Sequence, residues 1–374
     1  MRVLLIAGSY PPMKCGSGDY TAQLAGALGK RQDIKVAVLT SVAADAKHAT
    51  PNVEVFPVIQ GWKISDISRI FKIIRDWHPN IVHMQFGSIG YRLKVLPWLF
   101  PTLLRLRNLQ VVQTWHEYSG DPLRVLRNLP NAVISGGLVV VKPDFKNMMP
   151  GWYRWLIRHK QFRYIPNASA IPKIQLSDAE RSAIHSRFAA APDSLVSFFG
   201  FANPRKGVEA VFDIADPKRN SLALICELNP LNPYHKLLLE RINHGPWTGK
   251  VTVTGFLPPD EVARILAAAD AVVLPFPDGV GVWSTSAQAA MFQGTFVLAT
   301  SRERHGYDSA ENVYYANPGD IADMQQALFS YIGRKNDSVK NYADWDLIAG
   351  AHIQLYSDVL NGAQQRMKIK RNNI

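Results

Sequence analysis

Hydrophobic residues in the first part of the chain fall into short apolar runs that alternate with amphipathic stretches. The runs are rich in Val, Ile and Leu, which is typical of buried strands, and they cover 2–7, 35–40, 81–86 and 109–117. The stretches repeat apolar residues near every 3.6 positions, which predicts helices over 18–31, 64–77 and 91–107. This alternation indicates a parallel sheet with helices on both faces.

The alternation is interrupted at 143–170, where aromatic and basic residues crowd together, and 165–173 is interpreted as a linker. It then resumes, with strands expected at 194–201, 222–228, 251–256, 270–276 and 295–300. Helices are expected at 177–188, 206–216, 259–269, 284–293 and 345–360. The pattern predicts an α/β protein made of two doubly wound, Rossmann-like domains in tandem.

Composition narrows the class of protein. The 374 residues are 47% hydrophobic and 19% charged, which excludes a disordered chain. Only Cys15 and Cys226 are present, so a disulfide scaffold and a cysteine-based zinc site are excluded. The first residues lack the long apolar core of a signal peptide, and the apolar stretch at 95–104 is too short to span a bilayer. We expect a cytoplasmic protein that is soluble or bound to a membrane surface.

The net charge of +12 is unevenly distributed. Residues 1–170 carry 22 Lys and Arg against 9 Asp and Glu, whereas residues 171–360 carry 16 against 21. The basic first half suggests a polyanionic partner, and the candidates are nucleic acid, an anionic membrane or a phosphorylated substrate.

Ligands of open parallel sheets bind beyond the carboxyl ends of the strands, so the residues there are the candidates for chemistry. Gly16, Ser17 and Gly18 open the first helix, where backbone amides favour a phosphate, although glycine-rich turns of this kind are common. The strand at 81–86 carries His83 and Gln85, and the strand at 109–115 is followed by His116 and Glu117. A functional role is favoured for His116, whereas for His83 a hydrogen-bonded core histidine is the favoured alternative.

Two segments of the second half carry further candidates. Arg205 and Lys206 stand beside Gly207 at a strand-to-helix junction, which suits a diphosphate, the alternative being a solvated basic turn. In the second segment an acid and two spaced glycines precede a helix start with three hydroxyl residues. The alternative is a simple N-cap, but an N-cap needs only one hydroxyl. Its candidate residues are Asp278, Gly279, Val280, Gly281, Ser284, Thr285 and Ser286.

Several motifs follow one another in a specific order, namely PPMKCGSGDY, TWHEY, NPRKG, TGFLPPDEVARILAAADAVVLPF and WDLIAGAHIQLY. Over 2–361 the chain resembles the retaining, nucleotide-sugar-dependent glycosyltransferases of family 4. The resemblance implies the GT-B fold, in which two Rossmann-like domains face each other across a cleft. It also implies an acceptor domain at 1–168, a donor domain at 169–343, and a final segment at 344–374 that returns to the first domain.

The resemblance assigns roles to individual residues. Arg205 and Lys206 would bind the donor diphosphate, and Gly255 and Phe256 would lie near the base. The glycines at 16–18 would face the phosphate from the other domain. His116 would approach the transferred sugar, with Asp278 as the second candidate catalytic residue; His83, Gln85 and Glu117 are assigned to the acceptor.

Two departures from the family pattern stand out. Asp278 replaces the first of two usual glutamates, and the second glutamate is missing. The usual arginine before Lys206 is also absent, since Gly200 and Phe201 occupy its place. These changes point to a subgroup with a Pro-Asp-Gly-Val loop and leave room for weak or altered activity.

No Asp-x-Asp motif follows a predicted strand, so we expect no cofactor and no metal, with a UDP- or GDP-sugar as co-substrate. The cations at 205–206 and the helix start at 284–286 would stabilise the leaving diphosphate. Transfer with retention would then follow a same-face attack in which the diphosphate helps to deprotonate the acceptor.

Aromatic and basic residues interleave at 151–164, and basic residues flank an apolar centre at 91–107 (Arg92, Lys94, Arg105 and Arg107). Such surfaces suit anionic membranes, although an amphipathic helix packed on its own sheet is an equal alternative. No nucleic-acid motif accompanies them. We therefore expect a glycan or lipid-linked acceptor, in cell-surface polysaccharide or glycolipid synthesis.

Three other functions stay open. The same fold could serve a nucleotide-sugar epimerase or hydrolase, and the missing glutamate would suit a non-catalytic binding module. A dinucleotide oxidoreductase is disfavoured, because the first strand-to-helix turn lacks G-x-G-x-x-G.

Overall fold

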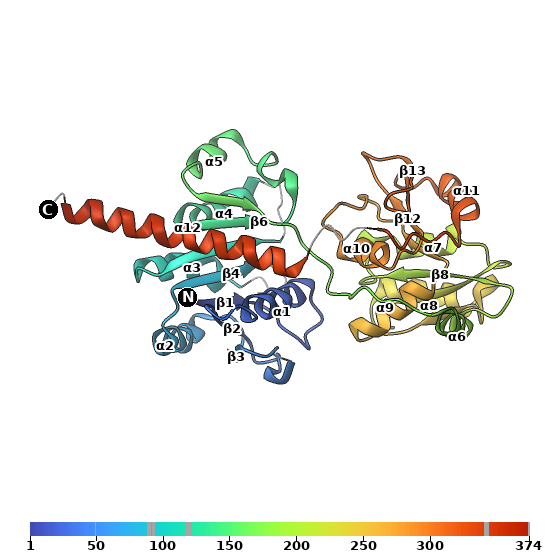
Figure 1. Cartoon of the computed structure of the whole chain (residues 1–374), viewed down its shortest axis with the longest axis horizontal. Coiled ribbons are helices and arrows are strands. Elements are labelled where there is room, and N and C mark those ends of the chain that lie inside the picture. Colours follow the sequence, from blue (N-terminus) through green and yellow to red (C-terminus); the bar gives the residue numbers. More distant parts are fainter. Residues whose placement is uncertain (49, 88–90, 92–93, 117–121, 340–343, 373–374) are drawn as a thin grey trace. The chain divides into compact units, whose positions relative to one another are not determined.

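The computed structural model describes residues 1–374 except 49, 88–90, 92–93, 117–121, 340–343 and 373–374. The side chains of 122–124 and 366–372 are also outside the description. The chain forms two compact units, each of which has its own sheet (Figure 1). Unit 1 contains Met1–Ala168 and Ala343–Ile374, and unit 2 contains Ser169–Tyr342.

The described part of unit 1 has a seven-stranded sheet in the order β3-β2-β1-β4-β5-β6-β7, and every pair of neighbours is parallel. Its strands are β1 (Arg2–Ala7), β2 (Lys35–Ser41), β3 (Val53–Ile59), β4 (Ile81–Phe86), β5 (Gln110–Trp115), β6 (Gly137–Val140) and β7 (Gln161–Tyr164). Its helices are α1 (Gly16–Gly29), α2 (Ile67–Trp77), α3 (Leu96–Leu106), α4 (Pro122–Ile134), α5 (Gly151–Leu156) and α12 (Trp345–Asn372).

Successive residues of each strand in unit 1 point to opposite faces of the sheet. Leu4 of β1 belongs to the core on the face of α2 and α3, while Val3 belongs to the core on the face of α1 and α12. Helix α12 lies against α1 and crosses β6 closely (Figure 1). A Cβ atom on Gly136 would come within 2.8 Å of Val359 of α12, so the start of β6 has no room for a side chain.

Among the described residues of unit 2, seven strands form a second sheet in the order β10-β9-β8-β11-β12-β14-β13, parallel except for the pair β13–β14. The strands are β8 (Ser194–Phe199), β9 (Asn220–Ile225), β10 (Val251–Val253), β11 (Ala271–Leu274), β12 (Val297–Thr300), β13 (Gly306–Asp308) and β14 (Val313–Ala316). The helices are α6 (Asp178–Phe188), α7 (Val208–Ile214), α8 (Pro233–Asn243), α9 (Pro259–Ala268), α10 (Thr285–Phe292) and α11 (Ile321–Tyr331).

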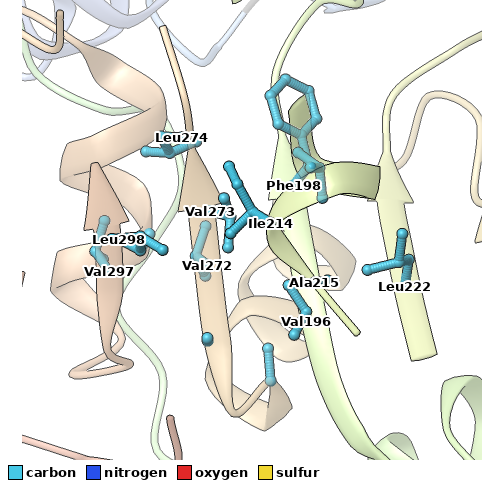
Figure 2. Close-up of a cluster of buried hydrophobic side chains, with 14 of the residues drawn as sticks. Val196, Phe198, Ile214, Ala215, Leu222, Val272, Val273, Leu274, Val297 and Leu298 are labelled. Atoms are coloured by element: carbon cyan, nitrogen blue, oxygen red, sulfur yellow. The ribbon is translucent and has the colours of Figure 1, made fainter. Parts of the chain in front are cut away.

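The core of unit 2 is built from short apolar strands buried on both faces. Figure 2 shows side chains of the neighbouring strands β8, β11 and β12 together with Ile214 at the end of α7. Val272 and Val273 are both fully buried although they point to opposite faces of β11, which explains why the strand is continuously apolar.

The predicted α/β class with two doubly wound sheets is confirmed. The predicted interruption at 143–170 is wrong, because β7 pairs with β6 and α5 precedes it. The segment 165–173 forms no helix or strand, and the two units divide between Ala168 and Ser169. Strands β3, β6, β13 and β14 and helices α4, α8 and α11 were not predicted. Strands β13 and β14 are only three and four residues long.

Candidate active site

Both sheets have a point at which the direction of strand addition reverses. In unit 2 the chain runs from β8 out to β10 and then returns to β11 beside β8. In unit 1 it runs from β1 out to β3 and returns to β4 beside β1. The crevice at the carboxyl ends of such strands is where ligands of open parallel sheets bind. The candidate residues of each unit are described around this point.

Arg205 and Lys206 lie in a 3₁₀ turn (Pro204–Lys206) between β8 and α7. The side chain of Asn203 accepts a hydrogen bond from the Arg205 amide at 3.1 Å and fixes the start of the turn. Gly207 then takes a left-handed conformation with φ of 59°, and a Cβ atom there would lie 2.4 Å from the Pro275 carbonyl oxygen. The glycine thus permits close approach of the turn to the exit of β11.

The ammonium group of Lys206 lies 3.8 Å from the centroid of the Phe276 ring. Burial lowers the pKa of Lys206 to about 8, because the charged form loses water there. The neighbouring Arg205 is exposed. A partly desolvated cation next to an exposed one is an arrangement that a diphosphate would neutralise.

The loop after β11 is held by backbone bonds to the end of β12. The Val280 amide donates to the Thr300 carbonyl at 2.7 Å, and Gly279 has φ of 82°. Asp278 projects from this turn with its side chain 81% exposed, and its carboxylate lies 3.8 Å from the Arg302 guanidinium. The carboxylate of Asp278 is therefore accessible to a ligand and only weakly paired.

The start of α10 uses one of its three hydroxyl groups as a cap. Ser284 Oγ accepts from the Ala287 amide at 3.5 Å, and the Ser284 amide donates to the Gly281 carbonyl at 2.9 Å. Within the described part of the chain, the amides of Thr285 and Ser286 have no hydrogen-bond partner. A Cβ atom on Gly200 would lie 3.0 Å from Ser286 Oγ, so the exit of β8 is close to these amides.

Two exposed aromatic rings stand together on the loops that follow β8 and β10. Phe201 is 44% exposed and Phe256 is 55% exposed, and their ring centroids are 6.3 Å apart. Gly255 precedes Phe256 with φ of 73°. Phe201 was noted only as a departure from the family pattern, and its pairing with Phe256 depends on the sheet order, which places β8 and β10 on either side of β9.

In unit 1 the first turn of α1 follows β1. A Cβ atom on Gly18 would lie 3.1 Å from the Ser9 backbone, whereas Gly16 has open space around it. Ser17 Oγ is 3.2 Å from Cys15 Sγ, and a Cβ atom on Gly87 after β4 would lie 3.7 Å from Ser17 Oγ. The sheet therefore brings Gly16, Ser17 and Gly18 to the exit of β4.

Hydrogen bonds connect a series of polar side chains from β4, β5 and α12 of unit 1. His116 Nε2 is 3.0 Å from Gln85 Oε1, and Gln85 Nε2 is 3.3 Å from His83 Nε2. His83 Nε2 also meets Thr114 Oγ1 at 2.8 Å, and His83 Nδ1 meets Tyr356 Oη at 2.7 Å. His83 is fully buried and His116 is half-buried, so His116 is the one that a ligand reaches directly.

A third histidine joins this cluster from α12. His352 is fully buried, donates from Nδ1 to the Ile348 carbonyl at 2.8 Å, and lies 3.4 Å from Tyr20 Oη through Nε2. Burial lowers the pKa of His116 and of His352 to about 4. Burial also lowers the pKa of His83, and the neighbouring His352 and His116 add to that effect. All three imidazoles are neutral at pH 7.

Sequence reasoning gave no role to Thr114, Tyr20, His352 or Tyr356. The signal for the last two was present, because they are four positions apart in HIQLY and so share one helix face. Glu117, assigned to the acceptor, lies outside the described residues. Over the described ranges, no group of three or more His, Cys, Asp or Glu side chains is arranged to hold a metal, and no helix has the length and apolarity to cross a bilayer.

Comparison of the sequence with protein-family models and with curated proteins finds no match. Solved structures match over nearly the whole chain. Sucrose-phosphate synthase from Thermosynechococcus elongatus has a TM-score of 0.71 and 18% identity, covering 97% of this chain and 100% of its own. HepE from Anabaena, in complex with UDP and glucose, has a TM-score of 0.67 and 17% identity, covering 100% of both chains.

A glycosyltransferase from Rickettsia africae has a TM-score of 0.72 and 12% identity, covering 96% of this chain and 98% of its own. These likenesses, together with the two parallel-dominated sheets, establish that the chain has the GT-B fold. At such identities the likeness defines the fold and not the activity.

Proposed function

We propose that this protein is a glycosyltransferase that uses a nucleoside diphosphate sugar, UDP- or GDP-linked, as donor. The observation that carries the proposal is the pair of cations Arg205 and Lys206, held beside the unpaired amides at the start of α10 at the reversal point of the unit 2 sheet. Structures of the same fold crystallised with UDP and with UDP-glucose support the assignment.

The geometry suits a diphosphate leaving group. As the bond from the anomeric carbon to the diphosphate oxygen breaks, negative charge grows on the diphosphate, and the two cations and the α10 amides would stabilise it. An acceptor hydroxyl then bonds to the anomeric carbon from the same face, and its proton passes to the diphosphate. The sugar keeps its anomeric configuration, and the step uses no metal.

The test of the donor site is the melting temperature of the full chain with UDP, GDP, ADP, UMP and NAD. A ligand at one hundred times its Kd adds about 2.7 kcal/mol to the free energy of unfolding. Of these five ligands, we expect only UDP or GDP to raise the melting temperature. We expect Lys206→Ala to abolish the rise. Lys218→Ala is the matched control, because Lys218 is an exposed lysine just before β9, at the opposite end of the strands.

The test of the reaction is transfer from the sugar nucleotide that the melting experiment selects. We expect a product whose anomeric configuration, read by NMR, equals that of the donor. Consumption of the donor without any acceptor would indicate an epimerase or a hydrolase. Absence of stabilisation by every diphosphate would overturn the proposal altogether.

The acceptor that we propose is a lipid-linked sugar or glycan at an anionic membrane, reached from unit 1. Helix α5 buries Tyr153 in the unit 1 core and turns Trp152, 50% exposed, and Trp155, 60% exposed, to solvent. The Arg158 guanidinium stacks 3.9 Å from the Trp155 ring, and Arg154 is exposed beside it. Exposed indoles between arginines suit the interface of an anionic membrane.

The basic residues at 91–107 contribute less to this surface. Arg105 donates to the Leu109 carbonyl and to Gln110 Oε1, and Arg107 stacks 3.7 Å from the Phe71 ring. Arg92 lies outside the described residues. The support for a membrane partner therefore comes from α5.

A further inference from the structure

Two consecutive residues at the start of α8, Tyr234 and His235, hydrogen-bond to the two ends of the segment that carries Arg205 and Lys206. Asn232 caps α8 by accepting a hydrogen bond from the Tyr234 amide at 2.9 Å, which fixes the start of the helix. Both side chains are half-buried. We call Tyr234 and His235 the α8 pair.

His235 holds the segment close to where it leaves β8. His235 Nε2 is 2.7 Å from the Ala202 carbonyl oxygen, and His235 Nδ1 is 2.8 Å from the Asn229 amide nitrogen. A backbone carbonyl only accepts and a backbone amide only donates, so the ring carries its hydrogen on Nε2 and its lone pair on Nδ1. One imidazole therefore joins the loop after β8 to the loop after β9.

Tyr234 holds the same segment where it enters α7. Val208 is the first residue of α7, so its amide has no acceptor within the helix. This amide donates to Tyr234 Oη at 3.1 Å, and the Tyr234 hydroxyl donates its own hydrogen to the Glu209 carboxylate. The hydroxyl is therefore used both as acceptor and as donor, and the first amide of α7 is satisfied.

The segment between these two bonds carries the candidate cations of the donor site. Arg205 and Lys206 are adjacent like charges, and the sequence at 202–208 contains no acidic residue to balance them. Repulsion between the two cations favours conformations of the turn in which they separate. A ligand would then have to order the turn as it binds, which lowers its affinity. Hydrogen bonds at both ends of the segment oppose this loss.

We propose that Tyr234 and His235 are positioning residues, which hold the turn at 203–207 so that a diphosphate meets Arg205 and Lys206 without further ordering of the backbone. The identity of the ligand as a diphosphate rests on the proposed function. The two bonds that hold the turn belong to the free protein, and they are tested without any ligand.

Amide hydrogen exchange of the full chain, followed by NMR, tests the two bonds. We expect the Val208 and Asn229 amides to be protected in the wild type, although Asn229 is exposed. Tyr234→Phe should speed exchange at Val208 about tenfold, and His235→Ala should do the same at Asn229, because each amide loses its acceptor. Unprotected amides in the wild type, or unchanged rates in the variants, overturn the proposal.

The tautomer of His235 is a second test on the free protein. A long-range ¹H–¹⁵N spectrum of the histidine rings should show His235 as the Nε2–H tautomer, and His235→Asn identifies its signals by their loss. Both partners of the ring are backbone groups, so the expected tautomer does not depend on the orientation of any other side chain. An Nδ1–H tautomer would overturn the proposal.

Two substitutions of His235 separate its two bonds. Glutamine places an N–H near the position of Nε2 and can keep the bond to Ala202, whereas the shorter asparagine reaches only the Asn229 amide. With UDP or GDP, whichever binds the wild type, we expect Kd to stay within about threefold in His235→Gln and to rise about tenfold in His235→Asn. Calorimetric titration measures both. Equal affinities in the two variants would overturn the role of the bond to Ala202.

Tyr314→Phe is the matched control for Tyr234→Phe. Tyr314 also donates its hydroxyl to a carboxylate, that of Asp323 at 2.7 Å, but it lies near the start of β14, at the opposite end of the strands from the candidate site. We expect Tyr234→Phe to raise the Kd of the nucleotide about fivefold and Tyr314→Phe to leave it unchanged. An equal rise in both variants would mean that loosening unit 2 is the cause, and the positioning role would be rejected.

Failure of this proposal differs from failure of the proposed function. If neither UDP nor GDP binds the wild type, the proposed function fails, and the exchange rates still decide whether the α8 pair holds the turn. If the nucleotide binds the wild type and binds His235→Asn and Tyr234→Phe as tightly, the positioning role is rejected while the donor site stands.

Discussion

Gly207 occupies a position that excludes any side chain. Its φ of 59° is unfavourable for other residues, and a Cβ atom would lie 2.4 Å from the Pro275 carbonyl oxygen. Gly207→Ala must therefore displace either the turn that carries Lys206 or the exit of β11. We expect a loss of about 2–4 kcal/mol in the free energy of unfolding, measured by urea denaturation, with weaker nucleotide binding.

Gly245→Ala separates the two contributions to that loss. Gly245 also has a positive φ, 80°, but open space surrounds its Cβ position. We expect it to cost about 1 kcal/mol, the backbone contribution alone. Equal losses in the two variants would show that the close approach to Pro275 has no energetic consequence.

Lys206 makes nucleotide binding depend on pH. Its pKa of about 8 in the free protein means that part of the population loses the charge above pH 8. A bound diphosphate favours the charged form and raises this pKa, so binding takes up a proton and weakens as the pH rises from 7 to 9. Calorimetry in two buffers of different ionisation enthalpy measures the uptake. Lys206→Arg, charged throughout this range, should remove it, and its persistence would exclude Lys206 as the source.

Single residues differ in how far the sequence reveals them. Arg205 and Lys206 stand out because charges beside a glycine at a strand exit have few structural explanations. The burial of His83 fits the favoured alternative of a core histidine, but its contact with Tyr356, 273 positions away, depends on where α12 packs. Phe201 acquires a partner in Phe256 only once the strand order is known.

At the scale of elements, α5 presents its two exposed indoles as a small apolar surface. We expect the protein to bind vesicles that contain anionic phospholipid and to bind neutral phosphatidylcholine vesicles much more weakly, measured by co-sedimentation. Trp152→Ser with Trp155→Ser should lower the partition coefficient at least tenfold, because both side chains, each at least half exposed, lose their contact with the interface.

The control for α5 replaces exposed apolar residues of unit 2. Leu231 is 89% exposed and Leu237 is 60% exposed, and Leu231→Ser with Leu237→Ser should leave vesicle binding unchanged. If both pairs of substitutions lower vesicle binding equally, α5 is not the membrane surface. The same conclusion holds if vesicle binding depends on net charge alone.

Length alone did not decide which elements were predictable, because α4, α8 and α11, of 13, 11 and 11 residues, were missed. Helix α2 and strand β4 follow the 3.6-residue and apolar patterns closely. Strand β7 was missed because it pairs along one edge only, with β6, and its residues Gln161 to Tyr164 show no apolar run. Pairing at a sheet edge stabilised it where local pattern did not.

At the scale of the whole molecule, the buried histidines tie stability to pH. The pKa of His116 and of His352 is about 4 in the folded state, and an unfolded histidine titrates near 6.5. Below pH 6.5 the unfolded chain therefore binds more protons than the folded chain, so stability falls as the pH decreases toward 4. Each histidine should cost on the order of 2 kcal/mol at pH 5.

Asp19 opposes this trend, because burial raises its pKa to about 6 and its protonation stabilises the folded state below that pH. We expect the histidines to dominate, with a lower urea midpoint at pH 5 than at pH 7. His352→Gln should reduce the difference between the two midpoints, whatever its effect at pH 7. A midpoint independent of pH, or an unchanged difference in the variant, would contradict this assignment.

The return of α12 to unit 1 has a consequence for protein synthesis. The first half of the chain leaves the ribosome long before Val359 and Tyr356, yet these residues cover Gly136 and complete the hydrogen bonds of His83. Unit 2 can finish folding as soon as it emerges, whereas unit 1 waits with part of one face of its sheet uncovered. The nascent chain therefore offers chaperones an apolar surface belonging to the part that was translated first.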